Sequence, residues 1–172
     1  MLVEQNGSIQ SVPGALNSTC IVEASINGQE VLVEASYAEL RIWKKQAGIW
    51  KLSHNVQDFY APIKSLEVDG TGTIWASHMY NGLYRIKLDD DLHRIKDLEH
   101  IHTLGGKQKS GKIHVMKIRG RIVFSNTEGY FMYDDIEREI KPYDLLNTSV
   151  PFLTDAHTAV DVHNNEMLWL IN

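Results

Sequence analysis

The chain has little of what several protein classes require. Cys20 is the single cysteine among 172 residues, which excludes an intrachain disulfide and a four-thiolate metal site. No apolar run approaches membrane-spanning length, and residues 1–5 lack the basic and apolar regions of a signal peptide. Basic residues are not in excess, since 17 Lys and Arg stand against 22 Asp and Glu, which argues against a broad nucleic-acid footprint. We therefore expect a soluble chain, with any export signal of its parent outside it.

Motifs of common catalytic and metal sites are missing as well. The sequence has no nucleophile elbow, phosphate-binding glycine loop, zincin motif or EF-hand loop. The Gly-Gly-Lys at 105–107 lacks phosphate-loop spacing, and the three aspartates at 89–91 are typical of a solvated hairpin turn. His100 and His102 share one face of a strand, but no third ligand stands in register with them. We expect no metal, no cofactor and no catalytic residue in this chain.

What the sequence does have is an internal repeat. Four run–turn–run units align on Leu32, Trp75, Val123 and Trp169, with spacings of 43, 48 and 46 residues. Each unit contains short apolar-alternating runs separated by turn residues such as Asn-Gly, Asp-Gly or Arg-Gly. Hydrophobic residues make up 43% and charged residues 23%, an ordinary globular composition. The period is about that of a four-stranded propeller blade.

The expected fold is therefore all-β, a β-propeller fragment with about four blades' worth of four-stranded antiparallel sheets. In the second unit the strands are expected at 63–68, 73–77, 82–88 and 92–96. Ile136 and Ile140 have helical spacing within 134–146, but Pro142 favours a strand end and a loop there. Residues 1–172 are expected as one propeller segment: an outer hairpin of a preceding blade at 1–12, full blades at 19–52, 63–96 and 113–142, and the inner half of a further blade at 157–172.

Four residues are expected to anchor the blades. Trp75 and Trp169 recur at one blade position, where an indole packs between neighbouring sheets. Gly82 and Gly129 stand where a strand must begin tightly against its neighbour. Trp43 and Trp50 are likewise expected in the core.

The second unit carries a family resemblance. An apolar run at 63–68 is followed by Asp69-Gly70 with further glycine and threonine residues, then by Ile74-Trp75, and finally by Gly82-Leu83-Tyr84-Arg85. This order resembles the two-component regulator propeller repeat. The other units match in part, because Ala38-Glu39-Leu40 replaces Asn-Gly-Leu and Val123-Phe124 replaces Ile-Trp. Together the four units cover residues 19–172.

The resemblance implies a function. In that family, propellers form the extracytoplasmic, periplasmic sensor of membrane-anchored hybrid histidine kinases, or of related regulators with a DNA-binding output domain, and the ligand is often an oligosaccharide. It implies that this chain is a non-catalytic sensor segment, with any kinase outside these residues. Two alternatives stay open. A propeller glycoside hydrolase or lyase would need acid and base side chains converging in one cleft, and a protein–protein scaffold would need a flat apolar face.

Ligand-binding residues are expected in the loops between second and third strands, which gather on one face of a propeller. Aromatic faces there would stack on sugar C–H groups, while Asn and His edges would hydrogen-bond to hydroxyls. These loops contain Tyr37, His78, Tyr80, Asn81 and Asn126.

Strand counting also predicts self-association. A half-blade at each end would expose an unpaired strand edge. Head-to-tail pairing of two chains would join these half-blades and give a ring of eight blades, within the usual range of about four to eight.

Overall fold

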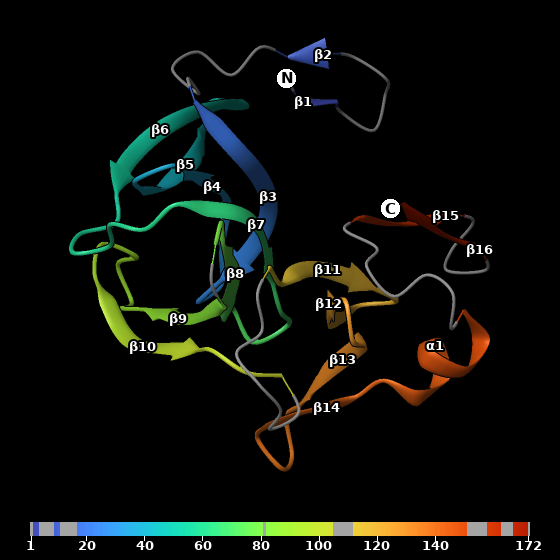
Figure 1. The fold of residues 1–172 in the computed structure, drawn as a ribbon. Helices are drawn as coiled ribbons and strands as arrows, with labels where there is room; N and C mark the ends of the chain where they lie inside the picture. Colours follow the sequence, from blue (N-terminus) through green and yellow to red (C-terminus); the bar gives the residue numbers. More distant parts are fainter. Residues whose placement is uncertain are drawn as a thin grey trace.

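The structure is a computed structural model. It describes residues 17–80, 82–104 and 112–150 in full, and the backbone of the strand residues 2–3, 9–10, 158–162 and 167–171. Three four-stranded antiparallel sheets make up most of it (Figure 1). They are the first sheet, with β3 (Ser18–Ile26), β4 (Gln29–Ser36), β5 (Leu40–Gln46) and β6 (Ile49–Asn55); the second sheet, with β7 (Ile63–Val68), β8 (Ile74–His78), β9 (Leu83–Leu88) and β10 (Ile95–Ile101); and the third sheet, with β11 (His114–Ile118), β12 (Arg121–Asn126), β13 (Gly129–Asp134) and β14 (Glu139–Pro142).

Two two-stranded sheets complete the described strands. One pairs β1 (Leu2–Val3) with β2 (Ile9–Gln10), and the other pairs β15 (Thr158–Val162) with β16 (Met167–Ile171). The two are separate, because β16 pairs only with β15 among the described strands. Self-association through these sheets stays a prediction.

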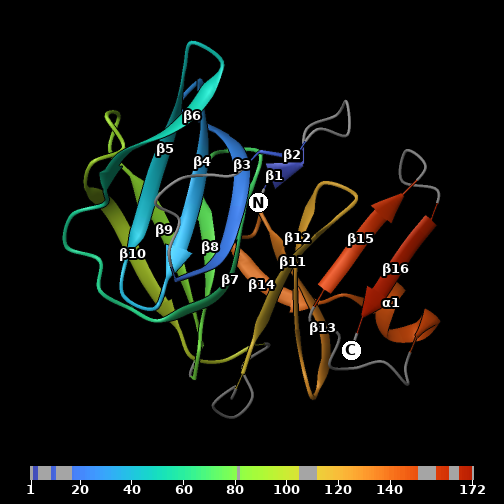
Figure 2. The same cartoon turned by 90° about the horizontal axis from the view of Figure 1, so that it is seen from above.

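The sheets follow one another as blades do. Within each four-stranded sheet the strands are paired in chain order, and its first strand contacts the first strand of the next sheet: β3 lies against β7, β7 against β11, and β11 against β15. In Figure 2, β3, β7 and β11 lie next to one another near the middle of the view. The predicted all-β, propeller-like architecture is confirmed.

The core lies between the sheets, as expected when a lone blade cannot cover both of its faces. Ile42 of the first sheet and Leu66 of the second belong to one apolar cluster, while Trp75 of the second sheet and Phe124 of the third belong to another. Burial of each such side chain contributes roughly 1.5–3 kcal/mol. Trp43, Trp50 and Trp75 are all buried.

The hairpin turns have the chemistry that their sequences indicate. Both residues of the β3–β4 turn, Asn27 and Gly28, have positive φ angles of 51° and 74°. Arg119 and Gly120, between β11 and β12, also have positive φ angles, of 49° and 76°. Two consecutive residues in this region match the right-handed twist of the flanking strands.

The expected fourth strand of the second sheet was misplaced. It begins at Ile95 and ends at Ile101 rather than covering 92–96. The turn extends further because Asp89 Oδ1 accepts hydrogen bonds from the backbone N–H groups of His93 and Arg94. Leu92 has a φ of 65° and is fully buried, so it anchors the turn and is not part of the strand.

The described residues also contain one short helix, which begins inside the segment 134–146 where a strand end and a loop were expected. Pro142 ends β14, and α1 (Asp144–Ser149) follows it. Leu146 packs into the cluster with Met116 and Tyr130. The Asn147 amide donates to the Tyr130 carbonyl and accepts from the Tyr130 N–H, so the helix replaces a missing strand partner at the start of β13.

Candidate functional site

The predicted ligand residues lie at equivalent ends of second strands. Tyr37 lies between β4 and β5 and is 61% exposed, and Tyr80 lies between β8 and β9 and is 68% exposed. His78 is the last residue of β8, and Asn126 is the last residue of β12. Asn81 and the side chain of Trp169 lie outside the described residues.

His78 and Tyr80 meet in a group of rings, which we call the ring cluster: His78, Tyr80, Tyr84, His100 and His102. The His78 ring lies 6.0 Å from the rings of both Tyr80 and Tyr84. Tyr84 stacks on its cross-strand neighbour His100 at 4.2 Å, and His100 lies 3.9 Å from His102. Within the described residues, no ring contact joins Tyr37 to this cluster.

The protonation of His78 is set by its surroundings. Burial, followed by the charge of His100, lowers the pKa of His78 below its ordinary value. The His78 Nδ1 accepts a hydrogen bond from the Tyr80 N–H at 3.1 Å, which also requires an unprotonated nitrogen. A neutral imidazole beside exposed aromatic rings is suited to a neutral ligand. In the described part of the chain, no three His, Cys, Asp or Glu side chains are arranged to hold a metal ion.

Asn126 lies in a different environment from the other predicted residues. It is 4% exposed, and its Oδ1 accepts the Glu128 N–H at 2.9 Å. This is a side-chain bond that shapes the β12–β13 turn. The residue therefore supports the loop and does not present its amide to solvent.

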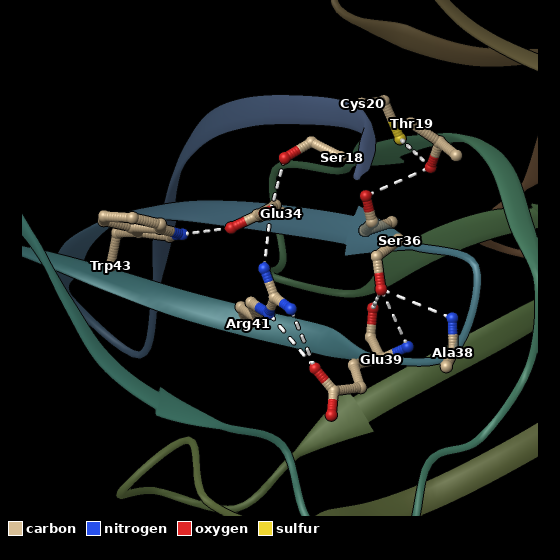
Figure 3. Close-up of polar contacts among 10 residues, drawn as sticks. Ser18, Thr19, Cys20, Glu34, Ser36, Ala38, Glu39, Arg41 and Trp43 are labelled. Atoms are coloured by element: carbon tan, nitrogen blue, oxygen red, sulfur yellow. Dashed lines mark hydrogen bonds and ion pairs between the residues drawn. The ribbon is translucent and has the colours of Figure 1, made fainter. Parts of the chain in front are cut away.

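Among the described residues, the most buried carboxylate belongs to a structural network (Figure 3). Glu34 is 0% exposed; its Oε1 accepts from the Ser18 hydroxyl and from Arg41, and its Oε2 accepts from Trp43 Nε1 at 2.6 Å. Arg41 also donates twice to Glu39. A buried charge whose acceptors are all engaged in this way is held in place and is not presented as a catalytic acid or base.

Glu67 of β7 is a second carboxyl in an unusual environment. Burial raises the pKa of Glu67 to about 7, and the charge of Lys117 opposes that shift. Lys117 Nζ donates to the Val68 carbonyl at 2.9 Å, which holds the cation beside the first strands of the second and third sheets. The Glu67 carboxyl therefore changes charge close to neutral pH.

Replacement of Glu67 by glutamine should change the pH dependence of stability. The folded state binds the Glu67 proton more tightly than the unfolded state, so this carboxyl costs stability as the pH rises from about 4.5 to about 7. Glu67→Gln should therefore match the wild type at pH 4 and be about 2–3 kcal/mol more stable at pH 8. Urea unfolding at both pH values measures this, with Glu30→Gln, on an exposed position of β4, as the control. An equal gain at both pH values would contradict the account.

Three cavities lie along the junction of the second and third sheets. Their volumes are about 470, 530 and 460 Å³, and Tyr133 of β13 lines all three. The first and third share Asp69, Thr71 and Asp135, and the second and third share Glu99 and Arg138. The predicted loop residues Tyr37, His78, Tyr80 and Asn126 line none of these three.

One end of this junction is built by the motif that carries the family resemblance. Asp69 Oδ1 accepts from the N–H groups of Thr71 and Thr73 and from the Thr71 hydroxyl, while Oδ2 accepts from Trp75 Nε1 at 2.9 Å. This fixes the β7–β8 turn against the Trp75 indole. The carboxylate of Asp69 is thus used by the fold.

Comparison with known proteins adds no relatives: no protein-family model matches the sequence, and no curated protein matches it. The resemblance to two-component propellers therefore depends on the motif in residues 63–86. No helix in the described residues is long and apolar enough to cross a membrane.

Proposed function

We propose that this chain is a non-catalytic sensor segment of a bacterial two-component signal-transduction protein, and that its propeller binds an oligosaccharide on the extracytoplasmic side of the membrane. The motif of residues 63–86 supports the family assignment, because its parts have the roles that a blade requires. Asp69 orders a turn beside Trp75, and Gly82 immediately precedes β9. The kinase or other output domain would lie outside these residues.

The observation that carries ligand binding is the ring cluster. Tyr80 presents a largely exposed ring beside the neutral imidazole of His78, and Tyr84 and His100 stack behind them. An exposed aromatic face can pack on the C–H face of a sugar, and imidazole edges can hydrogen-bond to its hydroxyls. This combination is suited to a neutral carbohydrate.

A non-catalytic role is favoured over the propeller-enzyme alternative by the state of the carboxylates. Glu34 is saturated with donors, and Asp69 is engaged in its own turn. Asp97 and Glu99, which do face a cavity, both lie within ion-pair distance of Arg85. Glycoside hydrolysis requires one carboxyl group to stay protonated opposite a second. Glu67 is the carboxyl whose pKa is raised to about 7, and it lines none of the three cavities.

The test is a glycan-binding screen with the purified chain, followed by calorimetry on Tyr80→Ala. We expect Tyr80→Ala to weaken binding by about tenfold or more, a cost of about 1.4 kcal/mol, without a change in the urea midpoint. Tyr60→Ala is the matched control, because Tyr60 is 81% exposed and lies in the segment between β6 and β7. A screen without any bound sugar would sink the carbohydrate part of the proposal.

A further inference from the structure

The three cavities form one continuous surface, which we call the seam groove, defined by the residues that line them. One wall is β10 and the residues after it, where Asp97, Glu99, Ile101 and Thr103 contribute at every second position. The intervening residues His100 and His102 belong to the ring cluster. Because side chains alternate between the faces of a strand, the seam groove and the ring cluster lie on opposite faces of β10.

The groove is elongated along β10. The stretch from Asp97 to Thr103 spans roughly 20 Å of extended backbone. The opposite wall comes from Tyr133 and from the residues at 138–142 on β14 and the turn before it. Such a surface is suited to an extended chain molecule and not to a single compact ring.

The groove carries charges of both signs. Its third cavity is lined by the cations Arg85, Lys87 and Arg138 and by carboxylates that include Asp97, Glu99 and Asp135. A polyanion or a polycation would meet like charges along either wall, which is costly. Closely spaced donors and acceptors are instead matched by hydroxyl groups, each of which donates one hydrogen bond and accepts others.

Several charged side chains of the groove are free to form hydrogen bonds with a ligand. Lys87, Asp135 and Arg138 are exposed, and none of their side chains makes a hydrogen bond or an ion pair with another described residue. Asp97 and Glu99 are also exposed and are paired with Arg85 only at 3.6 and 3.4 Å. A ligand can thus replace water at the groove wall without breaking a strong internal contact.

The floor of the groove is preorganised. The Arg85 guanidinium lies over the rings of Trp75 and Tyr133, at 5.9 and 5.7 Å from their centres, and the two rings are 4.6 Å apart. The Arg85 Nε is buried and has no hydrogen-bond partner within the described residues. The contacts among Arg85, Trp75 and Tyr133 hold the floor in place before any ligand binds.

We propose that the seam groove is a binding site for a neutral, extended oligosaccharide, with Tyr133 beneath the sugar chain and Lys87, Asp135 and Arg138 hydrogen-bonded to its hydroxyls. The ligand class rests on the proposed function. The location of the site is independent of the proposed function, because the groove lies on the face of β10 opposite the ring cluster and contains no residue of the cluster.

The test is calorimetric titration with cellohexaose, xylohexaose and maltohexaose as neutral probes and heparin and polylysine as charged probes. Wild type is expected to bind at least one hexasaccharide and to bind the corresponding disaccharide at least tenfold more weakly. The double variant Asp135→Asn/Arg138→Gln changes two exposed side chains and is expected to lose tenfold or more in hexasaccharide affinity, with an unchanged urea midpoint.

Tyr80→Ala separates this inference from the proposed ring-cluster site. Loss of hexasaccharide binding in the double variant supports the seam groove, whether or not Tyr80→Ala also weakens it. Loss in Tyr80→Ala with wild-type affinity in the double variant overturns the groove and leaves the proposed function intact. If no neutral hexasaccharide binds, or if only heparin or polylysine does, the inference and the carbohydrate part of the proposed function both fail.

Discussion

Replacement of Gly82 by alanine is expected to destabilise the protein by roughly 4 kcal/mol or to prevent folding. Gly82 has a φ of +74°, which L side chains rarely adopt, and a Cβ at this position would lie 2.3 Å from the Ile101 carbonyl oxygen. That oxygen belongs to the backbone at the end of β10, so relief requires β9 and β10 to separate. Much of the cost therefore comes from collision, in addition to backbone strain.

Gly120→Ala is the matched control for this prediction. Gly120 has a φ of +76°, almost that of Gly82, but a Cβ there meets nothing within 4 Å. The Gly120→Ala variant should therefore lose only the free energy of the backbone strain, about 1–2 kcal/mol. Urea unfolding curves of the two variants give the difference directly, and equal costs would show that the close approach of Ile101 to Gly82 is not a constraint on the fold.

Glu34→Ala is expected to cost about 3–5 kcal/mol, because it removes one partner from a buried, charge-assisted network. The variant leaves the buried Trp43 Nε1 and the Ser18 hydroxyl without the acceptor that they share, and it opens a space inside the first sheet. Arg41 loses its buried partner and keeps only Glu39. The melting temperature and the urea midpoint should both fall.

Glu39→Ala tests whether burial is the cause. Glu39 binds the same arginine at the same 3.1 Å, but its side chain is 34% exposed while that of Glu34 is fully buried. Exposed ion pairs contribute up to about 1 kcal/mol, so Glu39→Ala should cost far less than Glu34→Ala. Similar losses in the two variants would mean that the charge of Arg41, and not the buried acceptor, holds the network together.

Much of the fold could be predicted from the sequence because its signals are local. Alternating apolar runs and positive-φ turns such as Asn27-Gly28 specify hairpins within a few residues, and the repeat then places the sheets in order. The errors came from side-chain hydrogen bonds to the backbone, which no apolar or turn pattern reports. Asp89 extends its turn through side-chain bonds to the backbone of 93 and 94, and α1 exists because Asn147 pairs with Tyr130, 17 residues away.

The candidate site was less predictable than the fold, because its contacts depend on strand register and on the packing of two sheets. The exposed rings of Tyr37 and Tyr80 follow from their position in loops after second strands. The pairing of Tyr84 with His100 depends on the register of β9 with β10, and the misplaced start of β10 hid it. The seam groove depends on how two sheets pack, because this packing brings Arg85 next to Tyr133, 48 residues later in the sequence. The periodicity of residues within one sheet does not indicate how that sheet packs on the next.

The most direct measurement of the central claim combines binding and turnover in one experiment. The purified chain is titrated calorimetrically with each neutral hexasaccharide, and the sugar recovered after long incubation is analysed by mass spectrometry. A sensor segment should bind at least one of them and return it unchanged. Shortened or unsaturated products would identify an enzyme, and the absence of binding to every sugar would contradict carbohydrate sensing.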